Sequence, residues 1–506
     1  MDEQGDRPGM NERLDRRAFL AGLGLAGLSL AGADRAAALV PRPRPRTPPT
    51  PRTLREAVRG PVIERGSPGF AAAAHPYNER FDYVSPRAVV RPLDPADLSG
   101  AVRWAVAHDV PLRARSGGHS YAGYSTLKDG VVVDVRNMRG IGFDRRTGIA
   151  AIGTGAQLID VYSGLAAHGA TIPAGSCPSV GVAGVTLGGG MGLAGRAFGL
   201  TADNLRSAQI VTADGRRREV DARSDPELLW ALRGGGGGNF GIVTSLRFRV
   251  HRLPRSAAWF IVSWPWRSAE EALAAWQSWA PHARDELTSI FHLQTGSRSP
   301  SVLVAGQYLG RSGDLRRLLA PLTGVSGARA QTGDQDYLGL QLRWAGCLHQ
   351  SLGRCHTVGT SPGGTLERAS FRAKSDYVVR PLSSAGRRRL IGAIEIRQGQ
   401  SGSGAILFDA YGGAINRVAS DATAFVHRGA LYCIQYLAYD GGAAWLGQTY
   451  AGMRPDVSGM AYQNYIDADL AGWRRAYYGA NYPRLLAVRR RVDPDHRFNF
   501  PQAIGR

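Results

Sequence analysis

The pattern of hydrophobic and polar residues along the first part of the chain predicts a strand, a helix and two further strands. Residues 88–91 and 110–114 are short β-rich stretches. Between them, residues 94–108 begin with Asp-Pro-Ala-Asp, and a proline with acidic side chains suits the first turn of a helix. Residues 131–135 are a valine run broken only by Asp134, which is typical of a mostly buried strand.

A second block adds more strands and one capped helix. Ser224-Asp-Pro-Glu227 has the form of a capping box with proline early in the helix, and this helix is expected to end in the glycine run 234–238. Strands are expected at 150–154, 205–212, 216–220 and 242–250. The two blocks together predict an α+β domain over residues 55–250.

Residues 251–455 change in character, because tryptophans become frequent, and they indicate a second domain. The elements expected there are a helix near 268–280 and strands at 301–309, 404–410 and 430–437. This order predicts an antiparallel β-sheet backed by helices. The segment 456–506 is rich in Tyr, Asn and Arg, and it is expected to return irregularly, with one helix around 473–478.

The N-terminal residues have the pattern of a targeting segment followed by a linker. Arg16 and Arg17 precede an apolar run of about fifteen residues, which is shorter than the roughly twenty needed to span a bilayer. Residues 1–39 resemble a twin-arginine signal, which implies the twin-arginine (Tat) export machinery as a partner and a secreted or envelope-associated protein with no stable membrane anchor. An uncleaved anchor is the alternative. Residues 40–54 are rich in Pro and Arg and are expected to be an extended linker.

The net charge of +21 comes almost entirely from arginine, because Lys128 and Lys374 are the only lysines. Such a charge can favour binding to nucleic acid or to an anionic envelope. The sequence contains no nucleic-acid-binding motif, so no nucleic-acid partner is expected. The charge therefore indicates solubility and surface adhesion only.

The four cysteines are too few for a disulfide scaffold. No pair has the spacing of a zinc site or a redox dithiol, so no metal site is expected. Cys347 and Cys355 can form a disulfide after export, and two buried free thiols are an equally good interpretation.

Three glycine-bearing loops carry the candidate chemistry. In the first, 115–121, paired glycines let backbone N–H groups approach a ligand, and His119 follows them directly. In the second, 173–192, Cys177 lies just ahead of two glycine clusters, and in the third, 233–244, five consecutive glycines imply a very close backbone approach. The plain alternatives are a tight turn with a surface histidine, a structural loop with a buried thiol, and a flexible hinge.

Three such loops within about 130 residues favour one large ligand that contains a diphosphate. No P-loop lysine follows the second loop, which disfavours nucleotide hydrolysis. NAD requires a Rossmann fingerprint, and Gly22-x-Gly24-x-x-Gly27 lies inside the signal segment, with no strand before it. FAD is therefore the expected cofactor.

These loops and the C-terminal stretch Tyr462-Gln-Asn-Tyr465-Ile-Asp resemble the berberine-bridge-enzyme-like flavoprotein oxidases, which have a PCMH-type FAD-binding domain and belong to the vanillyl-alcohol-oxidase superfamily. The resemblance runs from about residue 75 to residue 506. It implies a two-part FAD-binding domain, a substrate domain, and a C-terminal segment that returns to the FAD domain. It also implies an 8α-histidyl flavin bond at His119 and a second bond, to flavin C6, at Cys177.

The resemblance implies further residues around the cofactor, most of them in the three loops. These are Arg115, Ser116, Gly117, Gly118, Ser120, Gly175, Gly181, Gly184, Gly188, Gly189, Gly192, Asn239, Gly241, Ile242, Val243, Tyr462 and Asn464.

The resemblance also implies that Tyr465 is the catalytic base beside flavin N5, and that Asp409 and Tyr411 assist deprotonation or hold the substrate. A phenol has a pKa of about 10, so Tyr465 needs an adjacent donor or positive charge to act near neutral pH. The base would take a proton from a substrate hydroxyl while a hydride passes to the flavin, and O2 would be reduced to hydrogen peroxide. For Asp409 and Tyr411, a hydrogen-bonded core pair is the alternative.

The expected substrate is a bulky small molecule, namely a sugar, a glycoside or a polycyclic metabolite, because doubly linked relatives have an open cleft. Two other functions remain open. One is a flavin dehydrogenase or oxidative cyclase with the same fold, and the other is a basic envelope-associated binding protein with a degenerate flavin fold.

Overall fold

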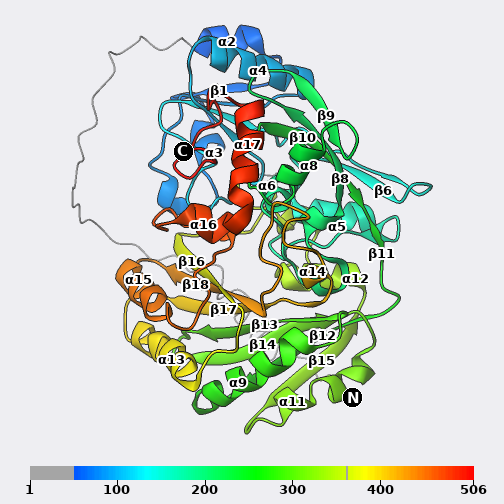
Figure 1. Ribbon diagram of the computed structural model, residues 1–506, viewed down its shortest axis with the longest axis vertical. Coiled ribbons are helices and arrows are strands. Elements are labelled where there is room, and N and C mark those ends of the chain that lie inside the picture. The colour runs from blue at the N-terminus through cyan, green and yellow to red at the C-terminus, as the bar shows by residue number, and fades with distance from the viewer. Residues whose placement is uncertain (1–50, 360–362) are drawn as a thin grey trace, which may run out of the picture.

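The computed structural model describes residues 51–359 and 363–506 (Figure 1). The fold is α+β, as predicted, and has two lobes. The upper lobe of Figure 1 contains residues 51–252 and 461–506, and the lower lobe contains residues 257–455. The predicted signal, 1–39, lies outside the described residues, as does most of the predicted linker.

The last residues of the predicted linker are helical instead. Helix α2 (Pro51–Ala57) includes residues 51–54, and Leu54 is fully buried in the core of the upper lobe. Proline is compatible with a first helical turn, because the N–H it lacks has no intrahelical acceptor there. The prediction of an extended chain up to residue 54 is therefore wrong by four residues.

A four-stranded sheet begins the upper lobe. Its order is β1 (Val62–Glu64), β2 (Ala88–Val90), β4 (Val131–Asp134) and β3 (Leu112–Arg115). Strands β2, β4 and β3 are parallel, and the predicted helix α4 (Pro95–Ala107) connects β2 to β3. Asp94 caps this helix by accepting hydrogen bonds from the N–H groups of Ala96 and Asp97.

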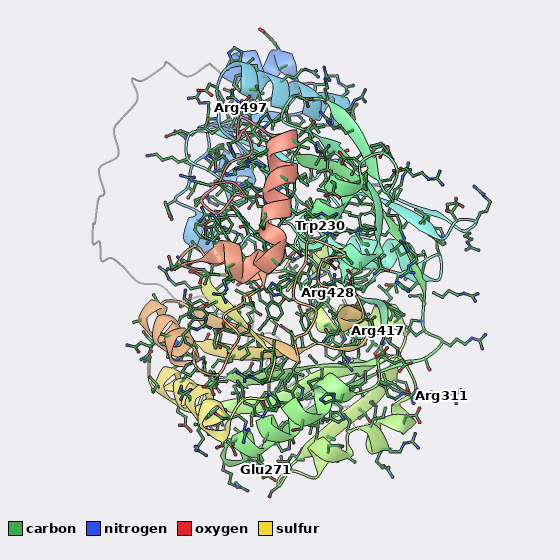
Figure 2. All side chains as sticks on the ribbon, viewed as in Figure 1. Trp230, Glu271, Arg311, Arg417, Arg428 and Arg497 are labelled. Carbon is green, nitrogen blue, oxygen red and sulfur yellow. A yellow bond between two sulfur atoms is a disulfide. The ribbon has the colours of Figure 1, made fainter. Side chains whose placement is uncertain are left out.

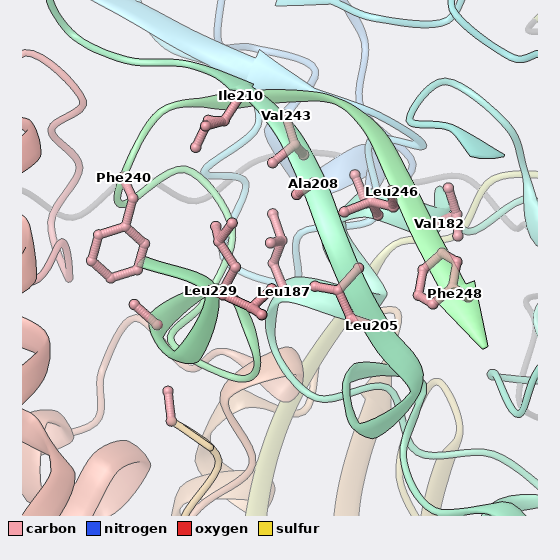
Figure 3. Close-up of a cluster of buried hydrophobic side chains, with 14 of the residues drawn as sticks. Val182, Leu187, Leu205, Ala208, Ile210, Leu229, Phe240, Val243, Leu246 and Phe248 are labelled. Carbon is pink, nitrogen blue, oxygen red and sulfur yellow. The ribbon is translucent and has the colours of Figure 1, made fainter. Parts of the chain in front are cut away.

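A five-stranded antiparallel sheet forms the rest of the upper lobe. Its order is β5 (Ile141–Asp144), β6 (Ile149–Gly153), β10 (Ile242–Arg249), β8 (Leu205–Val211) and β9 (Arg217–Asp221). Its helices are α5 (Leu158–Ala166), α6 (Val182–Leu187) and α8 (Pro226–Leu232). Figure 3 shows the core between sheet and helices, in which Leu187 and Leu229 face Ala208 and Val243.

The cap of α8 differs from the predicted capping box. The N-cap residue is Asp225, whose carboxylate accepts a hydrogen bond from the N–H of Leu228 at 3.0 Å. Ser224 instead accepts a hydrogen bond from the N–H of Asp221, in the preceding turn. Aspartate at position 225 therefore satisfies the helix start one residue later than predicted.

A seven-stranded antiparallel sheet forms the lower lobe. Its order is β15 (Arg329–Gln335), β12 (Ala257–Trp264), β14 (Ser301–Tyr308), β13 (Leu287–Gln294), β17 (Gly404–Ala410), β18 (Tyr432–Tyr439) and β16 (Phe371–Val378). Helices α9 (Ala269–Trp279), α13 (Ser384–Gln398) and α15 (Ala443–Gly452) cover the face away from the upper lobe (Figure 1). The predicted sheet backed by helices is confirmed.

The C-terminal segment completes the upper lobe. Helix α16 (Trp473–Tyr478) was predicted, whereas α17 (Tyr482–Val492) was expected to be irregular. Helix α17 contains many arginines, and among them lies a short apolar stripe. Its residues Leu485, Val488 and Val492 are buried in the core of the five-stranded sheet. The expected return of this segment to the first part of the chain is visible as the red helix of Figure 1.

Several short elements connect the larger ones. They are α3 (Phe70–Ala74), β7 (Ala170–Thr171), α7 (Gly195–Phe198), β11 (His251–Arg252), α10 (Leu315–Leu318), α11 (Ala320–Thr323), α12 (Tyr337–Trp344) and α14 (Gly413–Asn416). Cys347 and Cys355 form a disulfide, which decides between the two interpretations of this pair. Every helix in residues 51–359 and 363–506 is too short or too polar to cross a bilayer.

Two buried arginines join the lobes. Arg196, on α7 of the upper lobe, donates hydrogen bonds to four backbone carbonyls of the lower lobe, those of Leu287, Pro281, Tyr411 and Ala283. Arg428 of the lower lobe forms a bidentate ion pair with Asp203, at 2.6 and 2.9 Å, where the lobes meet (Figure 2).

Arg196→Met is expected to lower the free energy of unfolding by about 2–5 kcal/mol, because it leaves four buried carbonyls without their donor. Thermal unfolding followed by circular dichroism measures the loss. Arg417→Met is the matched control, because Arg417 is 62% exposed and its ion pair with Asp285 contributes little. Equal melting temperatures for the two variants would contradict the role of Arg196.

Candidate active site

A cavity of about 410 Å³ lies between the lobes. Its walls come from the three glycine-bearing loops of the upper lobe, from β13, β17 and β18 of the lower lobe, and from the C-terminal segment. Most candidate residues line it, namely Arg115, Ser116, Gly117, Gly118, His119, Ser120, Gly175, Cys177, Gly181, Gly184, Gly192, Gly241, Ile242, Val243, Asp409, Tyr462, Asn464 and Tyr465.

The first two glycine-bearing loops contact each other backbone to backbone. A Cβ added at Gly117 would lie 2.2 Å from the backbone N of Gly181, and one added at Gly181 would lie 2.0 Å from Ser116 Oγ. No larger residue fits at either position without moving the backbone. The two glycines therefore bring the His119 loop and the Cys177 loop together at one end of the cavity.

Four glycines that line the cavity have unpaired backbone amides. The N–H groups of Gly117, Gly118, Gly237 and Gly238 have no acceptor among the described residues, and all four glycines line the cavity. A Cβ added at Gly184 would meet nothing within 4 Å, so the space beside it is open. Free amides beside open space form the kind of concavity that binds a diphosphate. These residues therefore fit FAD.

His119 is held from two sides. Its Nε2 is hydrogen-bonded to Ser179 Oγ at 3.0 Å, and its ring stacks on Tyr77 with centroids 3.9 Å apart. Burial lowers the pKa of His119 to about 3, so the imidazole is neutral at physiological pH. Ser179 comes from the Cys177 loop, so the two predicted attachment residues belong to one assembly.

Cys177 is exposed to the cavity, and its thiol is free. Desolvation of the thiol by the surrounding protein raises the pKa of Cys177 to about 11, so the sulfur carries its proton near neutral pH. Neither a buried structural thiol nor a disulfide partner describes this position.

Arg115 lines the cavity, but its guanidinium is hydrogen-bonded to backbone carbonyls. It donates hydrogen bonds to the carbonyls of Ser125, Ala73 and Ala74, at 3.1, 2.5 and 2.7 Å. Burial lowers the pKa of Arg115 to about 10. Arg115 therefore fixes the start of the first loop to α3, and its predicted cofactor contact would come from the backbone.

Tyr465 and Asp409 meet across the cavity. The Tyr465 hydroxyl donates a hydrogen bond to Asp409 Oδ2 at 3.3 Å. The Tyr465 ring stacks on Tyr121, with centroids 5.4 Å apart, and the Tyr121 hydroxyl accepts a hydrogen bond from Gln435 Nε2 at 2.8 Å. Two tyrosines, a carboxyl group and an amide therefore converge at the cavity, and one of them, Tyr121, is the last residue of the first glycine-bearing loop.

The electrostatics of this pair differ from the expectation for a tyrosine base. Burial first, and then the nearby Asp409, raise the pKa of Tyr465 well above its usual value. Burial raises the pKa of Asp409 to about 7, against which the hydrogen bond from Tyr465 acts. Near neutral pH the stronger base is therefore the Asp409 carboxylate.

Tyr411 lies outside the cavity lining. It is fully buried just after the last residue of β17, and its hydroxyl is hydrogen-bonded to the hydroxyl of Tyr377 at 2.9 Å. The core alternative therefore describes the surroundings of Tyr411, with Tyr377 rather than Asp409 as its partner.

Three other candidate cofactor residues also lie outside the lining. Gly188 and Gly189 adjoin the Asn464 and Phe425 side chains, which a Cβ at either position would strike. Asn239 donates to the Gly235 carbonyl at 3.0 Å and accepts from the N–H of Ile504 at 2.9 Å. These residues shape the loops and the C-terminal contact instead of facing the cavity.

Tyr462 and Asn464 line the cavity and also hold the second loop in place. The Tyr462 hydroxyl accepts hydrogen bonds from the N–H groups of Gly190 and Met191 and from Asn464 Nδ2. Asn464 Nδ2 also donates to the carbonyl of Val185 at 2.9 Å.

Five lining or supporting residues were missed in the sequence, namely Tyr77, Tyr121, Ser179, His292 and Gln435. Tyr121 is the last residue of the first glycine-bearing loop, 115–121, and Gln435 is a polar residue inside the predicted strand 430–437, so both carried a signal. The contact of Tyr77 with His119 joins distant positions, and no local pattern indicates it.

Comparison with known proteins gives consistent matches. A family model described as FAD binding domain matches residues 86–221, and one described as berberine and berberine like matches residues 461–505. The FAD-linked oxidoreductase YvdP of Bacillus subtilis is 33% identical over 454 residues, which cover 88% of this chain and 98% of YvdP. The berberine bridge enzyme-like protein Cyn d 4 of Cynodon dactylon is 30% identical, over 83% of this chain and 84% of that protein.

Solved structures agree. The berberine bridge enzyme-like protein 1 of Physcomitrella patens superposes with a TM-score of 0.83 at 30% identity, covering 90% of this chain and 99% of that one. A chitooligosaccharide oxidase has a TM-score of 0.80 at 26% identity over 89% and 98% of the two chains. The xylooligosaccharide oxidase of Myceliophthora thermophila C1, in complex with xylobiose, has a TM-score of 0.80 at 26% identity over 90% and 98%.

The free amides of the glycine-bearing loops fit FAD, and the similarity extends over nearly the full length of the relatives. The chain belongs to the berberine-bridge-enzyme-like family of FAD-linked oxidoreductases.

Proposed function

We propose that the protein is an oxidase that holds its flavin through covalent bonds to His119 and Cys177 and oxidises a hydroxyl group of a carbohydrate or glycoside, with O2 reduced to hydrogen peroxide. The observation that carries this proposal is the Tyr465–Asp409 pair, which lines the same cavity as the glycine-bearing loops. The pair supplies a base for a hydroxyl proton at the place where a flavin ring would meet its substrate.

The proton of the substrate hydroxyl leaves through this pair. Tyr465 Oη accepts that proton and passes its own to Asp409 Oδ2, so a neutral phenol remains and the carboxylate becomes a carboxyl group. Tyr121 is fixed by Gln435 and by stacking on Tyr465, and it orients the reacting hydroxyl. FAD, held by the glycine-bearing loops, would supply the hydride acceptor for the substrate carbon and the route of the electrons to O2.

The positions of His119 and Cys177 support a double attachment. Both line the cavity, and their loops are joined by the Gly117–Gly181 contact and by the bond from His119 to Ser179. The neutral imidazole keeps a lone pair that can form a bond to carbon. The Cys177 thiol faces the same cavity from the second loop.

A carbohydrate substrate is supported by two of the superposed structures, whose names state oxidation of chitooligosaccharide and xylooligosaccharide. The proposal is tested by mixing the holoenzyme with glucose, cellobiose, xylobiose and chitobiose and following the loss of flavin absorbance in a stopped-flow instrument. Peroxide formed during turnover then separates an oxidase from a dehydrogenase or an oxidative cyclase that passes electrons elsewhere. No bleaching by any of the four sugars would overturn the substrate class.

The rate of flavin reduction is expected to rise with pH and to level off above about pH 7. Burial raises the pKa of Asp409 to about 7, and only its ionised form can accept the proton. Below that value the rate should fall by about tenfold per pH unit. Reduction rates measured between about pH 5 and about pH 9 test this. A rate that shows no step near pH 7 and is still rising at the alkaline end would return the role of base to a Tyr465 phenolate, whose pKa is raised by burial.

We also propose export through the twin-arginine route, on the sequence of residues 1–39 alone, with a secreted or envelope-associated mature protein. That route suits a protein that must acquire its flavin before it leaves the cytoplasm.

A further inference from the structure

Polar side chains face the cavity from three neighbouring strands of the lower lobe. Leu407 on β17 pairs in register with His292 on β13 and with Gln435 on β18, and Asp409 lies two residues further along β17. Residues two apart on a strand share a face, and register partners lie beside them on it. All four residues line the cavity.

His292 has an unused hydrogen-bonding atom. The residue is 7% exposed, and its Nε2 has no partner among the described residues. A buried polar atom without a partner costs free energy, so an atom of this kind beside a cavity indicates a position for a ligand. Burial lowers the pKa of His292 to about 4, so the ring is neutral near pH 7 and can either donate or accept.

Trp344 supplies an apolar wall to the same cavity. Its indole Nε1 donates a hydrogen bond to Gln307 Oε1 at 2.9 Å, which fixes the ring. A fixed aromatic surface combined with a few polar groups is the usual make-up of a small-molecule site.

The charges around the cavity favour an uncharged ligand at this end. At the end of the cavity beside His292, the charged side chain in the lining is that of Asp409. Arg113 and Arg115 also line the described cavity, but they lie on β3 of the upper lobe. A neutral imidazole gives no ionic contact to a carboxylate or an ammonium group, but it matches a hydroxyl, which both donates and accepts.

We propose that His292 forms a second substrate-binding position, where its Nε2 hydrogen-bonds a hydroxyl group other than the one oxidised. This inference rests on the proposed function and narrows the substrate to a neutral molecule with several hydroxyl groups. His292 and Asp409 are diagonal neighbours on adjacent strands, roughly 7–8 Å apart, so the two positions fit two hydroxyl groups of one sugar.

The experiment measures kcat/KM for flavin reduction in the holoenzyme, with the sugar of the four-member panel that reduces the flavin fastest and with its monodeoxy analogues. For the wild type, kcat/KM is expected to be about tenfold lower with one analogue than with the parent sugar, because that analogue lacks the hydroxyl bound by His292. His292→Phe should lower kcat/KM for the parent sugar to the value measured for that analogue. The value of kcat/KM for the analogue itself should stay unchanged. His292→Gln, which keeps a donor and an acceptor, should restore part of the discrimination.

His168→Phe is the matched control, because His168 is exposed on the upper lobe, and it should keep the wild-type ratios. Flavin absorbance shows that each variant is folded and loaded. If His292→Phe and His292→Gln lower kcat/KM by the same factor for the parent sugar and every analogue, or leave all values unchanged, the second binding position is wrong. The proposed function then still stands. If no sugar reduces the wild-type flavin, the proposed function fails, and the inference fails with it.

Discussion

Asp409→Asn is expected to slow flavin reduction by about 10²- to 10⁴-fold, the usual contribution of a positioned base. The amide keeps the shape of the side chain and its hydrogen bond to the Tyr465 hydroxyl, but it cannot accept a proton. The flavin spectrum and substrate affinity should change little. Single-turnover stopped-flow absorbance measures the effect directly.

Tyr465→Phe separates the two members of the pair. It should also slow reduction strongly, but the variant should keep a pH dependence near 7, because Asp409 still titrates. In Asp409→Asn this dependence should disappear. Asp440→Asn is the control, because Asp440 is exposed just after β18. In this variant the substrate should reduce the flavin at the wild-type rate. Wild-type reduction by Asp409→Asn would remove the carboxyl group from the mechanism.

The combined change His119→Ala with Cys177→Ala is expected to release nearly all flavin into the supernatant after acid precipitation. Either single change should leave the flavin with the protein, because the other bond remains. The two residues lie on loops joined at Gly117 and Gly181, so one flavin can reach both. Absorbance of pellet and supernatant at the flavin maximum gives the result.

The control for the double variant replaces a different thiol. His119→Ala with Cys433→Ala also removes one histidine and one free cysteine, but Cys433 is buried on β18 and outside the cavity lining. Its flavin should stay with the pellet. Free flavin from the wild type would show that neither bond exists.

Much of the framework could be predicted from local pattern. The valine run predicts strand β4, the acidic first turn predicts helix α4, and the alternation of polar and apolar residues predicts strand β10. Each of these patterns lies within the element that it predicts. Helix α17 was missed because its buried apolar positions are only three, set among arginines that dominate the local composition. Its structure depends on the core that it contacts, and that core is distant in sequence.

The candidate site shows the same division. The glycine-bearing loops and His119 carried a visible signal, since paired glycines indicate close backbone approach. Asp409 and Tyr411 are two residues apart and could not be separated by pattern, yet β17 ends at Ala410 and only Asp409 reaches the cavity. His292 and Gln435 become neighbours of Leu407 through strand register, which no single segment encodes.

The contact between Asn239 and Ile504 has a consequence for biosynthesis. The five-glycine loop is anchored by a backbone group that lies more than 260 positions later, and α17 closes the same core. A chain emerging from the ribosome therefore cannot finish its cofactor cradle until residues 461–505 are translated. Flavin capture must follow synthesis, and chains interrupted before that point should remain colourless and be open to proteolysis.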